Sequence, residues 1–288
     1  MAIKSAKTLL IGTGVALASV TGVAIAAGDS YDTGYEMSYK DWHWDGAFGS
    51  YDREAMQRGY QVYVEVCRNC HNLDHLAFRH LGDEGAPFHN PEYPNPNDNP
   101  LVKNIAAEFE VEDIDADTGD VITRPGIPAD YFPPVYPNAA AARAGNGGAY
   151  PPDLSVINKA RTGGADYIYN LLIAYDHPMP DGMKEQPGLY FNPVMEGNWI
   201  AMPPQLSDGL VEYQDNRPPE SDMPPPPEPT KEQLAADVTE FLAWSADPKL
   251  DARKTAGFMS LLYLLILAVL LWFSYKRVWA RLKQPVSG

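Results

Sequence analysis

The only two cysteines of the 288-residue chain, Cys67 and Cys70, lie three positions apart in the stretch VCRNCHNL, and His71 follows directly. Paired thiols serve several kinds of site, and three of them fit this pattern poorly. A disulfide across two residues closes a very small loop and constrains little of the unfolded chain. A thioredoxin-like redox pair belongs to a βαβ pattern. A zinc site needs about four ligands, usually as two cysteine pairs.

The chemistry that remains for C-x-x-C-H is covalent haem attachment. The two thiols add across the two vinyl groups of one porphyrin, so they must lie about one helical turn apart. The imidazole of His71 is then placed to bind the iron as its proximal ligand. The sequence therefore predicts one covalently bound haem c at Cys67, Cys70 and His71.

The other axial position of the iron has several candidate ligands. A methionine there gives a high-potential electron carrier, a second histidine lowers the potential, and an open position favours ligand chemistry. Met202, in WIAMPPQL, is the first candidate because two prolines stiffen the backbone after it and an apolar patch precedes it. Met179, in HPMPDGM, is the second. The remaining candidates, which are more typical of core or surface positions, are Met183, Met195, Met223, His43, His75, His80, His89 and His177.

A helix is expected to lead into the two cysteines. Ser50 or Asp52 supplies an N-cap at the beginning of SYDREAMQRGYQVYVEV. Apolar side chains then recur every three or four positions, which is the period of one helix face. These positions are Met56, Tyr60, Tyr63 and Cys67.

Two more helices are expected behind the attachment site. Asp153 follows two prolines and is predicted to cap the first of them, which breaks at Gly163–Gly164. Asp166 or Ala165 begins the next, which continues through Leu171–Leu172.

The rest of the soluble part is predicted as loops and one last helix. Residues 83–150 are rich in Pro, Asn and Gly and should be largely irregular. The run PPESDMPPPPEP, residues 218–229, is typical of a stiff extended spacer. Thr230 and Gln233 form a capping box. The helix face expected to pack on the helix before Cys67 consists of Leu234, Val238, Phe241 and Trp244.

Both ends of the chain indicate a membrane. Residues 1–26 combine two lysines, a weakly apolar stretch and small residues, as an export signal does. Residues 257–275 carry no charge and cover about 28 Å as a helix, close to a bilayer core. We therefore expect a periplasmic haem domain at 27–255, a transmembrane anchor at 256–276 and a basic cytoplasmic tail at 277–288 in the inner membrane of a bacterium.

The net charge of −16, from 38 acidic and 22 basic residues, argues against nucleic-acid binding. Such a surface suits solubility or a basic partner attracted over long range. The segment EFEVEDIDADTGD, residues 108–120, holds seven acids and no base. Two interpretations stay open for it: a solvated loop, or a docking surface for a basic cytochrome or a neighbouring subunit.

Several stretches resemble the cytochrome c1 family, the haem subunits of the cytochrome bc1 complex. They are WHWDGAFGSYDREAMQRGYQVYVEVCRNCHNLDHLAFRHL, PPDLSVINKARTGGADYIYNLL, GLYFNPV, IAMPPQL and TEFLAWSADPKLDARKTAG, in the family's order. The resemblance implies a mainly α-helical fold: a class I c-type cytochrome domain with long loops, plus one C-terminal transmembrane helix. It also implies Met202 as the sixth ligand, Arg161 and Tyr167 at the haem propionates, and Asn146 in the haem pocket.

The resemblance implies electron transfer rather than bond chemistry. A member of this family accepts electrons from a Rieske iron–sulfur protein and passes them to a soluble or tethered cytochrome c. It does so beside cytochrome b, in a dimeric quinol-oxidising complex. Some bacterial members carry an additional cysteine pair near the sixth ligand, which this chain lacks. Three alternatives stay open: a haem enzyme with an open sixth position, a dithiol oxidoreductase, and a tethered cytochrome c serving an oxidase.

Overall fold

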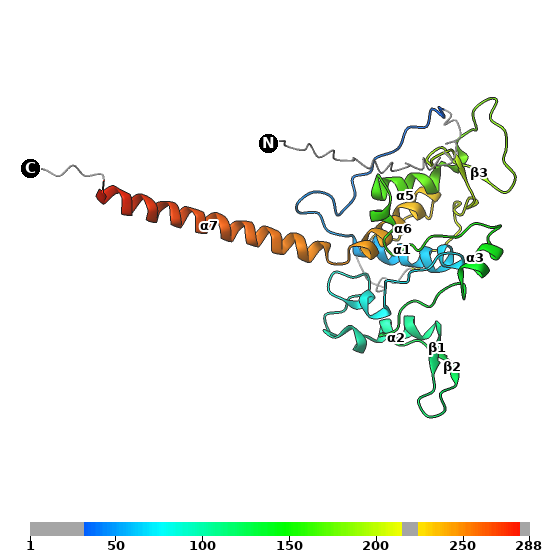
Figure 1. The fold of residues 1–288 in the computed structure, drawn as a ribbon, viewed down its shortest axis with the longest axis horizontal. Helices are drawn as coiled ribbons and strands as arrows, with labels where there is room; N and C mark the ends of the chain where they lie inside the picture. The colour runs from blue at the N-terminus through cyan, green and yellow to red at the C-terminus, as the bar shows by residue number, and fades with distance from the viewer. Residues whose placement is uncertain (1–31, 215–223, 283–288) are drawn as a thin grey trace, which may run out of the picture.

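Two packed helices, α1 (Arg53–Glu65) and α6 (Lys231–Ala246), form the centre of the region around Cys67 and Cys70. The structure is a computed structural model that describes residues 32–214 and 224–282. Figure 1 shows the two helices side by side at the middle of the body. At Gly59 an added Cβ would lie 2.0 Å from the carbonyl oxygen of Asp237, so glycine allows the backbones to approach this closely.

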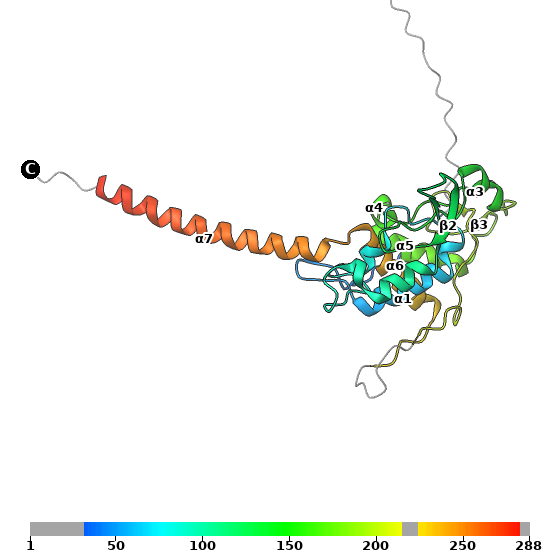
Figure 2. The same ribbon diagram turned by 90° about the horizontal axis from the view of Figure 1, so that it is seen from below.

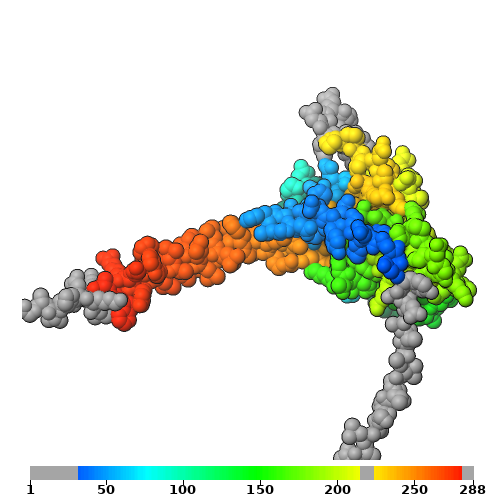
Figure 3. Space-filling model, turned by 90° about the horizontal axis from the view of Figure 1, so that it is seen from above, coloured from blue at the N-terminus to red at the C-terminus, as the bar shows by residue number. Residues whose placement is uncertain are grey.

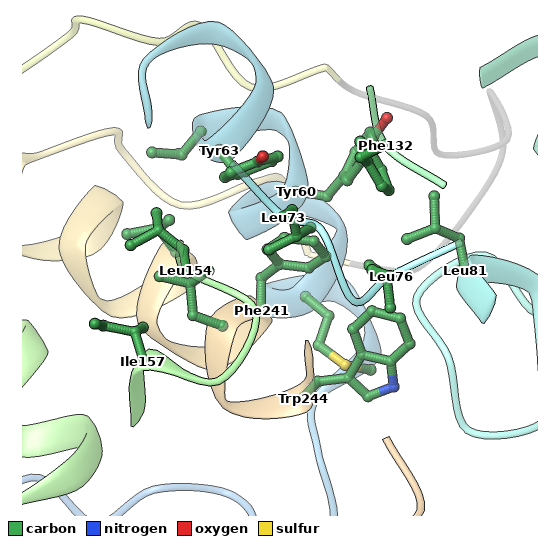
Figure 4. Packing of buried hydrophobic residues seen from close by; sticks show 14 of the residues in the cluster. Tyr60, Tyr63, Leu73, Leu76, Leu81, Phe132, Leu154, Ile157, Phe241 and Trp244 are labelled. Carbon is green, nitrogen blue, oxygen red and sulfur yellow. The ribbon is translucent and has the colours of Figure 1, made fainter. Parts of the chain in front are cut away.

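The predicted apolar faces of these helices are confirmed as the core. Tyr63, Phe241 and Trp244 are almost completely buried and lie around Leu73 (Figure 4). Aromatic rings pack edge-on or tilted, with centroids 5.6 Å apart for Tyr60 and Phe241. The other buried members of the two faces are Met56, Val62, Leu234 and Val238.

Side-chain caps and one buried ion pair hold this helix pair. The Asp52 carboxylate accepts hydrogen bonds from the backbone of Glu54 and Ala55 at 2.9 and 3.3 Å, which confirms Asp52 as the N-cap of α1. Arg58 on α1 donates two bonds of 2.8 and 2.9 Å to the buried carboxylate of Asp237 on α6.

The prediction of a largely irregular segment at residues 83–150 was partly wrong. After the short helices η2 (Phe78–Gly82) and η3 (Pro96–Asp98), the chain forms α2 (Pro100–Ala107), and α3 (Ala139–Gly145) follows later. Both helices have a side-chain N-cap, which the composition of the segment does not predict. The side chain of Asn99 accepts from Leu101 N, and that of Asn138 accepts from Ala141 N.

The acidic segment 108–120 forms the first strand and the turn of a β-hairpin. Strands β1 (Glu110–Ile114) and β2 (Val121–Pro125) pair antiparallel, with Glu112 opposite Thr123. The Asp115 carboxylate accepts from the backbone of Asp117 and Thr118 at 2.9 Å and so closes the turn. Figure 1 shows the hairpin projecting from the body.

Two helices follow the attachment site, and their limits differ from prediction. The first, α4, is short (Ile157–Ala160), and its N-cap position is Val156, not Asp153. The Asp153 carboxylate instead accepts hydrogen bonds from Asp74 N and Ser155 N. These bonds hold the loop that follows His71. The second, α5 (Gly164–Ile173), begins earlier than expected because the left-handed φ of 91° at Gly163 lets the chain turn directly into the helix.

Long connections cover this core on one side. After α5 come η4 (Ala174–Asp176) and a small hairpin of β3 (Tyr190–Phe191) and β4 (Trp199–Ile200). The Pro-rich spacer lies partly outside the described residues, and residues 224–229 form no helix or strand. Thr230 caps α6 through Gln233 N at 3.2 Å, but the Gln233 side chain bonds to Asp237, so only half of the predicted capping box forms.

A single long helix, α7 (Leu250–Leu282), leaves the body, as Figures 1 and 2 show. Its 33 residues correspond to about 50 Å. Within the described residues it is the one helix long and apolar enough to cross a membrane, with mean hydropathy 2.4 in its most apolar window. The predicted fold class, mainly α with one C-terminal membrane helix, is therefore confirmed. The predicted signal at 1–26 and the end of the tail at 283–288 lie outside the described residues.

Candidate haem-attachment site

Cys67 begins the short helix η1 (Cys67–Asn69), which continues directly from α1, and Cys70 follows as its C-cap. The carbonyl oxygen of Cys67 accepts from the backbone N–H groups of Cys70 at 3.1 Å and His71 at 2.9 Å. The side chain of Asn69 satisfies the free carbonyls at the end of α1, at 3.0 Å from Glu65 O. Both thiols are free. The turn therefore presents two unpaired thiols and an imidazole within one helical turn, as covalent haem attachment requires.

His71 has the hydrogen bond expected of an iron ligand. Its Nδ1 lies 2.7 Å from the carbonyl oxygen of Pro152, and a carbonyl can only accept, so Nδ1 carries the proton. The lone pair of Nε2 is consequently free to bind a metal. Burial lowers the pKa of His71, which favours the neutral imidazole. The Pro152 carbonyl lies 81 residues away in sequence, so only the fold supplies this partner.

The environment of the thiols does not suit a dithiol–disulfide redox pair. Burial raises the pKa of Cys67 to about 12, whereas a redox-active cysteine needs a lowered pKa. Cys70 lines a small cavity of about 70 Å³ with aromatic and small side chains, among them Tyr136, Ala142 and Tyr150. Within the described residues there is also no group of three or more Cys, His, Asp or Glu side chains arranged to hold a metal ion, as the zinc interpretation requires.

Asn146, predicted in the haem pocket, lies just behind this cavity. It ends helix α3, and its side-chain amide donates to Ala142 O at 2.7 Å and to the Tyr136 hydroxyl at 3.1 Å. Both of these partners line the cavity around Cys70, whereas Asn146 does not. The structure therefore connects Asn146 to the attachment site through Tyr136.

Arg161 and Tyr167 lie on either side of the glycine turn between α4 and α5. An added Cβ at Gly163 would lie 3.2 Å from the Tyr167 Cβ, so the turn packs closely on that tyrosine. Burial raises the pKa of Tyr167, and the nearby Arg161 charge opposes the rise. The exposed guanidinium donates to Ala160 O at 3.2 Å, while the Tyr167 hydroxyl points to the sulfur of Met195 at 3.6 Å.

Met202 follows β4 and is held through its backbone. Its carbonyl oxygen accepts a 2.8 Å hydrogen bond from the Tyr175 hydroxyl. Burial raises the pKa of Tyr175, so the hydroxyl stays protonated and keeps donating. A second bond, from the Asn192 side chain to Leu171 O at 2.9 Å, ties the β3–β4 hairpin to α5. These contacts hold the Met202 segment in a chain that has no cysteines for a bridge there.

Sequence reasoning did not single out Tyr175 or Pro152. Tyr175 carries no motif of its own, because its role depends on a partner 27 residues further along the chain. Of the competing methionines, Met179 lines a surface cavity of about 720 Å³, Met183 is buried, and Met223 lies outside the described residues. Met195 is the acceptor of the Tyr167 hydroxyl.

Four of the other histidines considered as ligands have one ring nitrogen hydrogen-bonded within the protein. His43 contacts Glu240 at 2.9 Å, His89 contacts Gly82 O at 3.2 Å, and His177 contacts Thr33 O at 2.8 Å. The Nδ1 of His80 accepts from Ala77 N at 3.1 Å. The structure thus brings two free thiols and the Nε2 of His71 together in one turn, whereas Met202 lies in a separate segment held by Tyr175.

Comparison with known proteins identifies the family of this chain. The model of the Cytochrome C1 family matches residues 42–282. "Cytochrome c1-2, heme protein, mitochondrial" of Solanum tuberosum is 42% identical over 276 residues, covering 95% of this chain and 96% of the relative. "Cytochrome c1" of Rhodospirillum rubrum is 38% identical over 293 residues, covering 96% and 98%.

A third relative is longer than this chain. "Cytochrome b/c1" of Bradyrhizobium diazoefficiens is 40% identical over 257 residues, which cover 83% of this chain but only 35% of that protein. The match across most of the chain includes the C-x-x-C-H turn, the glycine turn and the Met202 segment. The chain therefore belongs to the cytochrome c1 family, whose members are haem-containing c-type cytochromes.

Proposed function

We propose that this chain is the haem-bearing electron carrier of a cytochrome bc1 complex. Cys67 and Cys70 would hold one haem c covalently, and His71 and Met202 would bind its iron. The observation that carries the proposal is the 2.7 Å bond from His71 Nδ1 to Pro152 O, because it turns Nε2 into a fixed donor beside two free thiols. The haem, when bound, supplies a one-electron ferrous–ferric couple.

The chain's residues position and enclose this couple. Arg161 and Tyr167, on either side of the glycine turn, contact the propionates, since a guanidinium suits a carboxylate through paired hydrogen bonds. Asn146 supports the pocket wall through Tyr136. Met202 completes the iron coordination, so no substrate reaches the metal. The isolated subunit is accordingly an electron carrier and not an enzyme.

We infer the membrane arrangement from the sequence pattern together with α7. Residues 1–26 serve as an export signal, 27–255 as a periplasmic haem domain, 256–276 as the anchor and 277–288 as a cytoplasmic tail of a bacterial inner-membrane protein. The uncharged stretch of α7 and the basic residues after it support this orientation. The name of the Bradyrhizobium relative, "Cytochrome b/c1", supports cytochrome b as a neighbour.

The remaining partners are a Rieske iron–sulfur protein as donor and a soluble or tethered cytochrome c as acceptor, in a dimeric complex. The acidic hairpin β1–β2 supports a basic acceptor. Glu110 and Glu112 point to solvent on β1, whereas Asp113 is engaged by Arg124 at 2.6 Å. The two free carboxylates, together with the exposed turn, give the hairpin a negative field that attracts a basic partner.

A visible spectrum and a redox titration of the purified full-length chain test the proposal. We expect a haem that stays bound on a denaturing gel, a mass gain of one tetrapyrrole and a methionine–iron charge-transfer band. Rapid carbon monoxide binding to the native protein would instead indicate an open sixth position and a haem enzyme. Alkylation of Cys67 and Cys70 in the purified protein would indicate a dithiol oxidoreductase. Purification without cytochrome b would favour a tethered cytochrome c that serves an oxidase.

A further inference from the structure

An exposed aromatic ring lies beside the beginning of the membrane helix. Phe48 is 81% exposed, yet its ring centroid is 5.6 Å from that of Phe258 on α7, with the ring planes 70° apart. Phe258 is the second residue of the uncharged stretch 257–275. Phe48 thus extends the apolar surface at this end of the span, and most of its ring stays uncovered.

The loop that carries Phe48 is fixed to α7. The Lys254 ammonium in the first turns of α7 donates to two backbone carbonyls of the loop, Trp44 O and Gly49 O, the latter at 2.8 Å. These bonds bracket residues 44–49, so the loop cannot move independently of the helix. Figure 3 shows the N-terminal segment, in blue, lying across the body and reaching the beginning of α7, in orange.

The same loop is also fixed to the haem domain. Trp44 stacks on Trp42 with ring centroids 4.9 Å apart, and the Trp42 indole donates to Asp166 on α5 at 2.8 Å. Tyr51, just after the loop, contacts Trp44 and donates to Ala243 O on α6 at 3.0 Å. The loop therefore connects α5 and α6 to α7 through rigid aromatic side chains.

We propose that the loop Trp44–Gly49 is a second membrane-contacting element, which seats Phe48 in the interfacial layer of the bilayer and so sets the angle between the haem domain and α7. The occupant of this surface is lipid, because the exposed ring continues the apolar surface of α7 where that helix enters the bilayer. Aromatic rings are enriched at this depth. The charged groups nearby suit the polar boundary: Lys254 binds the loop carbonyls, and Asp45 at the loop tip is exposed. The proposal rests on the membrane span and does not depend on which residues bind the iron; its test also uses haem attachment at Cys67 and Cys70.

Site-directed spin labelling of the full-length, haem-loaded chain in phosphatidylcholine nanodiscs tests this contact. Both native cysteines carry the haem, so a new cysteine is the only thiol available to the label. Ala47→Cys reports on the loop and leaves Phe48 in place. Ala140→Cys, an equally exposed alanine on α3 at the far end of the body (Figure 2), is the matched control. Ala268→Cys, in the middle of α7, reports on the span itself.

We expect the label at 47 to collide more with oxygen than with a water-soluble nickel chelate, as at 268, and the label at 140 to show the reverse. Adding Phe48→Ser to Ala47→Cys should move the label at 47 toward water, and Phe48→Trp should restore its depth. A label at 47 in water while that at 268 is in lipid would overturn the loop contact alone. A label at 268 in water would overturn the span and the contact with it. If the label at 47 is protected from both oxygen and the nickel chelate, a second copy of the chain covers the loop. This result would overturn the lipid contact.

Discussion

The hydroxyl of Tyr175 donates a 2.8 Å hydrogen bond to the backbone carbonyl of Met202. This bond joins the end of the α5 region to the segment that carries the proposed sixth ligand. It acts on the backbone, so it holds the position of the segment and leaves the thioether of Met202 free.

Tyr175→Phe should loosen the Met202 segment. A single net hydrogen bond contributes about 0.5–1.5 kcal/mol, so the folded protein loses about that much stability. We expect a weaker methionine–iron band and measurable carbon monoxide binding, because the ligand leaves the iron more often. Tyr190→Phe, at a partly exposed tyrosine of the same cavity, is the control and should change neither. An unaltered band and no carbon monoxide binding in Tyr175→Phe would show that the bond does not position the ligand.

Met202→Leu should remove the methionine–iron band and lower the midpoint potential sharply, because leucine has no donor for the iron. The measurement is a redox titration followed by the visible spectrum. Met179→Leu, in the surface cavity, should keep both properties. Loss of the band in Met179→Leu, with an unchanged band and potential in Met202→Leu, would identify Met179 as the ligand.

Neutralising the free carboxylates of the hairpin should slow electron delivery to a basic cytochrome. Glu110→Gln with Glu112→Gln leaves the Asp113–Arg124 pair and the Asp115 turn intact, so the hairpin keeps its fold. Stopped-flow oxidation at several ionic strengths should show a lower rate and a flatter salt dependence.

The control for this experiment is Glu84→Gln with Glu92→Gln, which changes the net charge equally at two exposed acids outside the hairpin. Equal rates for the two double variants would mean that the hairpin has no part in docking.

The contribution of the His43–Glu240 pair to stability should fall as the pH rises past the ordinary range of histidine. The Glu240 carboxylate lies 2.9 Å from His43 Nδ1 and raises the pKa of that histidine above its usual value of 6.5. Burial also raises the pKa of Glu240, so both groups hold protons more tightly in the folded state. At this pair the folded chain then binds more protons than the unfolded chain, so the contribution of the pair to stability declines with rising pH.

The His43 contribution is complete below about pH 6.5 and is lost as the pH passes through the raised pKa. His43 is partly exposed, so its effect should stay below about 1 kcal/mol. Thermal unfolding at a series of pH values measures it, and His43→Gln should flatten the curve between pH 6 and 8. A curve of unchanged slope in this variant would rule out the histidine as the source.

Gly59→Ala should destabilise the α1–α6 pair. The new methyl group would lie 2.0 Å from Asp237 O, so the helices must separate, at a cost of about 1–3 kcal/mol. Gly257→Ala, where nothing lies within 4 Å, is the matched control. Denaturant unfolding followed by the haem spectrum compares the two, and equal midpoints would contradict the close helix contact.

The local features of this protein were determined by its sequence. The C-x-x-C-H turn, the N-cap at Asp52, the apolar faces of α1 and α6 and the long apolar helix α7 all follow from residue types at fixed spacings. Such patterns involve residues close to one another in the sequence, so they can be recognised without knowledge of the fold. The limits of α4 and α5 and the hairpin at 110–125 were missed, because loop side chains such as Asp153 bond in ways that composition does not show.

The partners that make the site specific were decided only by the tertiary structure. Pro152 O reaches His71 across 81 residues, the Tyr175 hydroxyl reaches Met202 O across 27, and Phe48 meets Phe258 on a separate element. No spacing rule predicts these contacts, because each depends on how the packed core turns distant loops toward one another. A carbonyl or hydroxyl becomes a specific partner when burial leaves it one available neighbour, and packing alone determines which neighbour that is.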